Sequence, residues 1–244
     1  ENNNLLAQAY IGLGNARYID NEFSRGKWYL KAIECAEDDN NILAQAYIGL
    51  GNARYTDDRH TRNHTWYLKA IDHAEGNRNL LSQAYIGLGN ARYTDEKHTD
   101  NHVWYLEAIE CVGEDNNILA QAYIGLGNAR CTDNGFTQSD WYLKAIECAG
   151  EDNNLLAQAY IGLGNARYTD IEHTRNHAWY RKAIEYAGED NNLLAQAYIG
   201  LGNARYTDEK HTENHVWYLE VIECAGEDNN LLAQAYIGLG NARY

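Results

Sequence analysis

Histidine is the residue type whose spacing in this chain most directly suggests chemistry. Eight of the nine histidines form His-x-x-x-His pairs. On a helix this spacing places two imidazoles on one side, where together they can ligate a metal ion such as zinc or copper. The pairs are His60/His64, His98/His102, His173/His177 and His211/His215.

Aromatic packing or capping is the competing interpretation of these pairs. In two otherwise similar stretches the first histidine position is occupied by Phe23 or Phe136, so the position mainly requires a flat ring. A closed metal site also needs further ligands, and neither a cysteine nor a second pair lies at a fixed spacing from the histidines. We therefore predict no metal and no cofactor, and metal binding by the pairs is the least favoured alternative.

Amide side chains form a second repeated set. An asparagine recurs once per repeat, and a glutamine precedes it by seven residues, which places both on one face of a helix. We use the name amide ladder for Gln45, Asn52, Gln83, Asn90, Gln121, Asn128, Gln158, Asn165, Gln196 and Asn203. Amides both donate and accept hydrogen bonds, which suits the backbone of a bound chain and suits water equally well. The ladder predicts either a ligand-binding groove or a solvated helix face.

Catalysis is not indicated by any motif. The spacing Gly49-x-Gly51-x-x-Arg54 superficially matches a dinucleotide fingerprint, but that fingerprint follows a strand and opens a helix. Here the spacing falls inside a predicted helix and occurs seven times. Catalysis normally needs one asymmetric site, and no nucleophile, base and orienting residue occur together as a single special copy. We predict that the protein is not an enzyme.

The elements that carry these residues are copies of one stretch, Ala-Gln-Ala-Tyr-Ile-Gly-Leu-Gly-Asn-Ala-Arg-Tyr at 44–55. Its tyrosine recurs at an almost fixed step of about 37–38 residues, a period typical of stacked helical repeats. The copies are Tyr10, Tyr47, Tyr85, Tyr123, Tyr160, Tyr198 and Tyr236. The step from Tyr10 to Tyr123 equals the step from Tyr123 to Tyr236, so a longer period overlies the short one. We predict a single repeat array over 1–244, with three-repeat units at 1–113 and 114–226 and a partial copy at 227–244.

Each repeat begins with an acidic or amide cluster that predicts a helix start. At 114–117 the cluster Glu-Asp-Asn-Asn supplies an N-cap and places negative charge at the positive end of a helix beginning near Ile118. Apolar residues then lie on two faces of this first helix, so we expect it to pack on two sides. A narrow polar stripe remains for solvent, formed by Gln45, Gly49, Asn52 and Thr56.

Glycine in the middle of the first helix requires an explanation. Gly49 and Gly51 each cost about 1 kcal/mol relative to alanine in a helix interior. Because both recur in every copy, we predict that they are packing positions, for example where a neighbouring backbone comes close.

A variable segment and a second helix complete each repeat. The segment, 56–65 in the second repeat, is one residue shorter at 19–27 and 132–140, so it is predicted to be the turn between the helices. The second helix carries Trp66 and Tyr67 on its apolar stripe and generally ends at a glycine. One tryptophan per repeat at an equivalent site indicates core packing. Four of the five cysteines sit seven residues after a tryptophan and are predicted to be free core thiols.

The repeat resembles the tetratricopeptide repeat. With Ala44 as the first position, Tyr47, Leu50, Gly51, Tyr67 and Ala70 occupy the fourth, seventh, eighth, 24th and 27th positions of that signature. The resemblance covers essentially the whole chain. It implies an all-α, right-handed α-solenoid or superhelix of tandem helix-turn-helix repeats, each of about 37–38 residues. It further implies six helix pairs and a seventh first helix, with first helices lining the concave side and the ladder asparagines contacting the backbone of an extended bound peptide.

Several positions depart from this resemblance. The phrase Trp-Tyr-Leu-Lys-Ala at 66–70 is also similar to Sel1-like repeats, although their long glycine-rich turn is missing. Asn63 stands where tetratricopeptide repeats have a small alanine, and Arg54 stands where they prefer tyrosine. Ile48 occupies the place of a groove lysine, so recognition of a peptide carboxyl terminus is not predicted.

Charge narrows the class of partner. The chain has 20 Lys and Arg against 35 Asp and Glu, a formal net charge of -15. This charge disfavours nucleic acid and anionic membranes and favours a basic or neutral protein partner. The sequence contains no run of 18 apolar residues, so it does not predict membrane insertion. The sequence does not indicate a cellular compartment.

Two functions follow from these observations. The leading prediction is a non-catalytic scaffold that binds a protein or peptide along the groove lined by the amide ladder. The alternative is self-association into a head-to-tail filament. It rests on the first and last copies of the repeat, which carry the same apolar residues at Leu5, Leu6 and Tyr10 and at Leu231, Leu232 and Tyr236 without polar capping helices.

Overall fold

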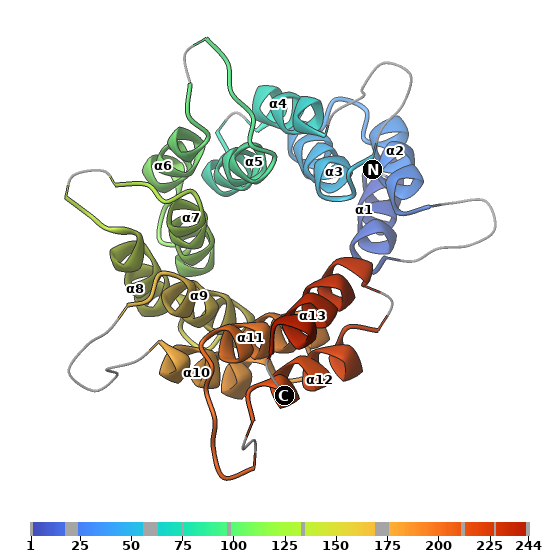
Figure 1. Ribbon diagram of the computed structural model, residues 1–244. Helices are drawn as coiled ribbons and strands as arrows, with labels where there is room; N and C mark the ends of the chain where they lie inside the picture. Colours follow the sequence, from blue (N-terminus) through green and yellow to red (C-terminus); the bar gives the residue numbers. More distant parts are fainter. Residues whose placement is uncertain are drawn as a thin grey trace. The chain divides into compact units, whose positions relative to one another are not determined.

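The computed structural model describes residues 2–17, 24–55, 63–74, 76–96, 99–132, 135–168, 176–210, 213–226 and 228–242. These residues form thirteen α-helices and no strand, which confirms the predicted all-α fold of tandem helix pairs (Figure 1). The helices are α1 (Asn2–Asn15), α2 (Arg25–Cys35), α3 (Asn40–Asn52), α4 (His64–His73), α5 (Arg78–Asn90), α6 (His102–Cys111), α7 (Asn116–Asn128), α8 (Gln138–Ala149), α9 (Asn153–Asn165), α10 (His177–Ala187), α11 (Asn191–Asn203), α12 (His215–Cys224) and α13 (Asn229–Asn241).

The helices are grouped into two compact units, 1–125 and 126–244. Within each unit an odd-numbered helix packs against the even-numbered helices beside it and against the next odd-numbered helix. Among the described residues of each unit, even-numbered helices do not contact one another. The odd-numbered layer is therefore the more closely packed one, and each unit curves toward it. The boundary between the units lies inside α7, whereas the predicted boundary at 113/114 describes a sequence duplication.

From α3 onward the odd-numbered helices begin at side-chain caps, as the sequence predicts, although α7 starts two residues before the predicted Ile118. The Asp115 carboxylate accepts a hydrogen bond from the backbone N–H of Ile118 at 3.1 Å, and α7 begins at Asn116. Asp39 caps α3 in the same way through Ile42 at 3.1 Å. These carboxylates satisfy N–H groups that have no partner within the helix.

A tyrosine of each even-numbered helix lies in a slot between two glycines of successive odd-numbered helices. A Cβ added to Gly51 of α3 would lie 2.5 Å from the Tyr67 ring, and one added to Gly87 of α5 would lie 2.3 Å from the same ring. The slot tyrosines are Tyr29, Tyr67, Tyr105, Tyr142, Tyr180 and Tyr218.

This arrangement confirms that the glycines are packing positions and corrects two details of the prediction. An aromatic ring, and not a backbone, approaches them. In addition Gly49 is buried beneath Tyr29, so it does not belong to the exposed stripe of α3. Thr56, the last predicted member of that stripe, lies outside the described residues.

In the second to sixth repeats a tryptophan hydrogen-bonds the backbone at the end of the preceding helix. Trp66 is 2% exposed, stacks on Tyr47 and donates its indole N–H to the carbonyl oxygen of Tyr55 at 2.7 Å. The equivalent bonds from Trp104, Trp141, Trp179 and Trp217 are 2.7–2.9 Å long. The predicted core role of these residues is confirmed.

The five cysteines are free, as predicted, but only Cys131 is buried. The other four are partly exposed on even-numbered helices, so the prediction that they lie in the core was too strong. No described helix has both the length and the apolar character needed to cross a membrane.

Candidate binding surface

The amide ladder lies on the odd-numbered helices, with each glutamine in the first half of a helix and each asparagine at its last residue. Nine of its ten side chains are exposed and Gln158 is half-buried. The structure thus brings the predicted residues to one layer of each unit, on helices that contact one another in succession.

Each ladder asparagine accepts a hydrogen bond from a slot tyrosine. The Tyr180 hydroxyl donates to Asn165 Oδ1 at 2.9 Å, and the other ladder asparagines receive equivalent bonds of 2.8–2.9 Å from Tyr67, Tyr105, Tyr142 and Tyr218. Because Oδ1 is occupied, the amide NH2 group remains as a donor for another molecule. Sequence reasoning missed this structural role, since the tyrosine is 14 or 15 residues away.

Two ladder glutamines use their NH2 group inside the helix, whereas the asparagines use their oxygen. Gln158 Nε2 donates to Asn154 Oδ1 within α9, and Gln196 Nε2 donates to Asn192 Oδ1 within α11. The Oε1 atom of each is left as an acceptor. Helices α9 and α11 therefore each offer an acceptor at a glutamine and a donor at an asparagine.

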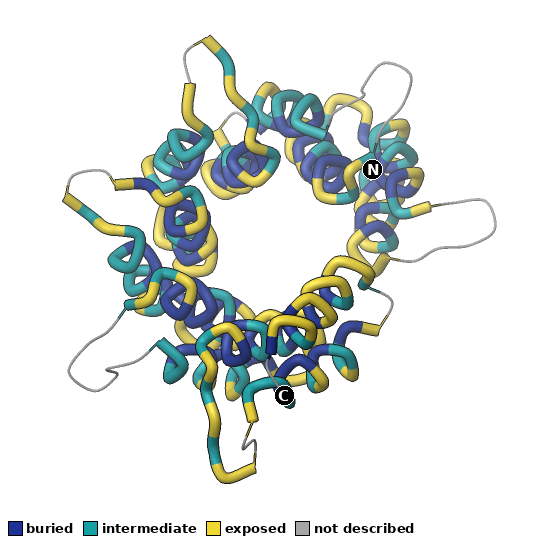
Figure 2. The backbone as a smooth tube through the Cα atoms, viewed as in Figure 1, coloured by how far each residue is buried: buried dark blue, intermediate teal, exposed yellow. Residues whose placement is uncertain are grey.

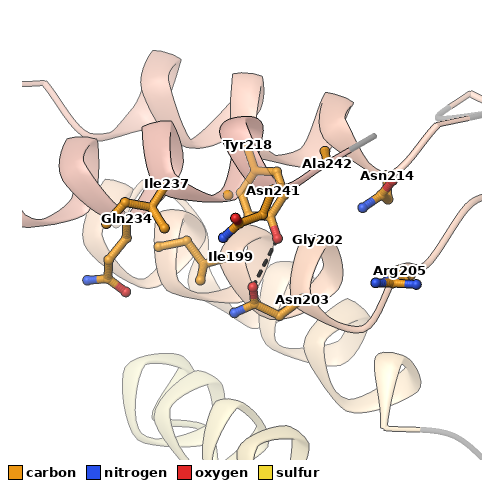
Figure 3. Close-up of a pocket in the computed structure, with 11 residues that line it drawn as sticks. Ile199, Gly202, Asn203, Arg205, Asn214, Tyr218, Gln234, Ile237, Asn241 and Ala242 are labelled. Atoms are coloured by element: carbon orange, nitrogen blue, oxygen red, sulfur yellow. Dashed lines mark hydrogen bonds between the residues drawn. The ribbon is translucent and has the colours of Figure 1, made fainter. Parts of the chain in front are cut away.

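A pocket of about 330 Å³ lies on this surface between α11 and α13. Its lining includes Ile199, Asn203 and Arg205 from the first helix and its C-terminal turn, and Gln234 and Asn241 from the second. Figure 3 shows Asn203 hydrogen-bonded to Tyr218, with Gln234 and Ile237 projecting from α13. The pocket combines amides, a guanidinium group and an apolar wall, so it suits a polar chain with small apolar side groups.

In the first six repeats an arginine follows the end of the odd-numbered helix in a conformation that favours glycine. Arg54 has φ 51°, its N–H donates to the Gly51 carbonyl at 3.0 Å, and the next N–H, that of Tyr55, donates to Leu50 at 3.1 Å. The left-handed conformation costs a non-glycine residue about 1–2 kcal/mol. The same conformation occurs at Arg17, Arg92, Arg130, Arg167 and Arg205. The departure of Arg54 from the family resemblance was the only sequence signal for this feature.

At the start of α6, α8 and α10 an amide side chain ties the helix to the odd-numbered helix before it. Asn101 Nδ2 donates to the Gly89 carbonyl at 3.3 Å, and Gln138 Nε2 donates to the Gly127 carbonyl at 3.0 Å. Alanine, which the family resemblance implies at this position, cannot make this bond. The contact explains why an amide stands there.

The histidine pairs are described only in part. The first members, His60, His98, His173 and His211, lie outside the described residues. Of the second members, His64 stacks on Tyr93 with ring centroids 4.4 Å apart, and His177 stacks on Tyr206 at 4.2 Å. Within the described part of the chain no group of three or more His, Cys, Asp or Glu is placed to hold a metal ion. The observed contacts of His64 and His177 are those of aromatic packing.

Burial changes the acidity of the slot tyrosines. It raises the pKa of Tyr67, Tyr105 and Tyr180 to about 12, and nearby arginines such as Arg92 and Arg167 offset part of this effect. The hydroxyls therefore stay protonated at neutral pH and can act as donors to the asparagines.

Comparison with protein-family models and with curated proteins gives no match. The fold and this surface define the chain as a tandem helical-repeat protein. Its resemblance to tetratricopeptide repeats stays a prediction.

Proposed function

We propose that this protein is a non-catalytic scaffold that binds an extended protein segment along the amide ladder. The observation that carries the proposal is the fixed orientation of the amides. Tyr180 directs the Asn165 NH2 group outward as a donor, while Asn154 leaves the Gln158 oxygen as an acceptor. A backbone peptide group offers the complementary carbonyl and N–H.

The repetition of this pattern supports an extended ligand over a compact one. Helices α9 and α11 carry the same donor and acceptor and contact each other, so one chain can meet equivalent groups as it passes from helix to helix. An extended strand has its own backbone groups unpaired and gains main-chain hydrogen bonds on such a surface.

The test uses asparagine-to-aspartate variants. Asn128→Asp, Asn165→Asp and Asn203→Asp combined keep an oxygen for the tyrosine hydroxyls but remove the outward NH2 donors. Random displayed peptides are first selected on the wild-type protein, and their affinities are then measured by calorimetry. We expect the triple variant to bind them at least 10-fold more weakly.

The matched control removes the tyrosine hydroxyls and keeps the asparagine side chains. Tyr142→Phe, Tyr180→Phe and Tyr218→Phe combined delete the hydroxyls and keep the asparagine donors, so peptide affinity should fall much less than in the aspartate variant. Equal affinity of wild-type and aspartate variant for the selected peptides would show that the ladder is not the binding surface.

A head-to-tail filament is the second candidate function. It is favoured by apolar side chains that stay exposed on α1 and α13: Leu5 is 65% exposed, Tyr236 59% and Ile237 64%. Burying such residues against a second copy is favourable, and a contact between two different surfaces propagates when it does not close. Light scattering over a range of concentrations and electron microscopy test it. Assembly that is lost in Ile237→Glu supports the filament, and a monomer at every concentration excludes it.

A further inference from the structure

We propose that the arginine row of the second unit, Arg130, Arg167 and Arg205, binds carboxylate side chains of the segment that occupies the amide ladder. This inference rests on the proposed function and adds the chemistry of the partner. The partner is an acidic extended peptide, in contrast to the basic or neutral one that the net charge of -15 favours.

At Arg205 the arginine row and the ladder face the same space. Each arginine follows a ladder asparagine by two residues. In the pocket between α11 and α13, Arg205 and Asn203 line one cavity together with Gln234 and Asn241 (Figure 3). A ligand that meets the amides in this pocket is therefore within reach of a guanidinium group.

The local charge of this surface differs from that of the whole chain. Helices α7, α9 and α11 contain no charged residue. The nearest acids at their opposite ends are capping residues such as Asp152 and Asp190, which already accept backbone hydrogen bonds. A helix of 13 residues is about 20 Å long, so these capping acids are far from the arginines. An aspartate also follows each arginine by three residues in the sequence, and the described one, Asp208, accepts the Lys210 N–H at 3.0 Å and forms no ion pair with Arg205.

The arginines themselves are available. Arg130, Arg167 and Arg205 are exposed, and none of them forms an ion pair with a described residue. Free guanidinium groups favour carboxylates, because two parallel N–H donors match the two carboxylate oxygens. In a chain with 35 acidic residues, three arginines in equivalent places that form no ion pair with a described residue are an unusual surface.

The backbone conformation at these positions argues that the side chain is used. Arg130, Arg167 and Arg205 have φ of 55°, 56° and 52°. Glycine adopts this conformation without strain and would end the helix equally well. A strained residue that recurs where glycine fits is a reason to look for function in its side chain.

The spacing of the row defines the sequence of the partner. Packed helices lie about 8–10 Å apart, and an extended chain advances about 3.3 Å per residue. Arg167 and Arg205, which follow the contacting helices α9 and α11, therefore match residues three apart in an extended peptide, and Arg130, one repeat earlier, extends the same spacing. Three arginines call for carboxylates at positions i, i+3 and i+6.

The experiment compares three nine-residue peptides on the full chain by calorimetry. The first has Asp at positions 1, 4 and 7 and Thr elsewhere, the second has Asn in place of Asp, and the third has its three Asp residues adjacent. We expect the first to bind at least 10-fold more tightly than either of the others, and its affinity to fall with added salt. A ten-residue single-stranded DNA is included, and DNA binding tighter than that of the first peptide would overturn the assignment to a peptide.

The variants distinguish peptide binding by the arginines from peptide binding by the amides. Arg130→Gly, Arg167→Gly and Arg205→Gly combined should abolish the preference for the first peptide while leaving the urea midpoint unchanged or higher, because glycine relieves the strained conformation. Arg→Asn at the same three positions provides a second neutral variant that tolerates this conformation. Arg181→Gln changes an arginine on α10 outside the row, which contacts Tyr206, and should leave the preference for the first peptide unchanged.

The outcomes distinguish this inference from the proposed function. If the preference survives both arginine variants, or if the glycine variant loses stability and keeps binding, the arginines serve the helix ends and the inference is wrong. Binding that is lost in Gln158→Ala with Gln196→Ala but kept in the arginine variants supports the amide ladder alone. Binding that is lost in both sets of variants supports the inference. Binding lost only in the arginine variants removes the ladder as the site, which overturns the proposed function and with it the placement of the segment in this inference.

Discussion

Helices α9 and α13 have the same sequence, Asn-Asn-Leu-Leu-Ala-Gln-Ala-Tyr-Ile-Gly-Leu-Gly-Asn, and very different surroundings. In α9, Tyr160 is 8% exposed and Ile161 is 6% exposed, because α10 and α11 cover them. In α13 the equivalent Tyr236 and Ile237 are 59% and 64% exposed, and Figure 2 shows exposed residues along this helix. A helix as short as these two is marginal in water when it is isolated. The comparison teaches that each odd-numbered helix depends on neighbours on both sides.

The largest effect should come from removing a slot tyrosine beside α9. Tyr180→Ala empties the slot between Gly164 and Gly200, and truncating a buried aromatic ring costs about 3–5 kcal/mol. Tyr236→Ala on α13 is the control, because its ring is mostly solvated and should cost less than about 1 kcal/mol. Urea denaturation followed by circular dichroism measures both. Similar losses in the two variants would contradict the slot packing.

The burial of the Tyr180 hydroxyl should also make the stability of the protein fall at alkaline pH. The folded-state pKa of Tyr180 is about 12, against about 10 in an unfolded chain. The folded state therefore keeps a proton that the unfolded state loses, so this stability is complete below pH 10 and is lost as the pH rises toward 12. Tyr180→Phe should flatten the fall in urea midpoint between pH 10 and 12, and an unchanged slope would show that Tyr180 does not control it.

Glycine substitutions distinguish occupied slots from open ones. Gly164→Ala puts a Cβ 2.6 Å from the Tyr180 ring, whereas Gly240→Ala meets nothing within 4 Å. Overpacking costs about 1–3 kcal/mol, while alanine in an open helix position gains up to about 1 kcal/mol over glycine. The two variants should therefore shift the thermal midpoint in opposite directions. A shift of the same sign in both would argue against the ring contact.

The features that could be predicted from the sequence are those that depend on residues close together in the chain. The helix starts follow from caps such as Asp115, and the two packed faces of the first helix follow from the spacing of its apolar residues. The contacts of Gly51 and Asn52 with Tyr67 could not be predicted, because they depend on how two helices pack. The left-handed Arg54 was missed because glycine is the residue usually expected there. Nine of the ten ladder residues are exposed, as expected, but which amide atom faces outward could be read only from the partners seen in the structure.

The smallest effect concerns the asparagine that ends each of the two helices compared above. Asn165 of α9 accepts the Tyr180 hydroxyl, whereas no described tyrosine donates to Asn241 of α13. Asn165→Ala removes the acceptor and leaves the largely buried Tyr180 hydroxyl without this hydrogen bond. The variant should therefore destabilise the protein by about 1 kcal/mol. Asn241→Ala should change stability by less than about 0.5 kcal/mol. In the double variant Asn165→Ala with Tyr180→Phe no donor is left unpaired, so part of the loss should be recovered. Additive losses in this double-mutant cycle would mean that the two side chains do not interact. The ladder asparagines would then be free to present their oxygens as well as their NH2 groups to a ligand.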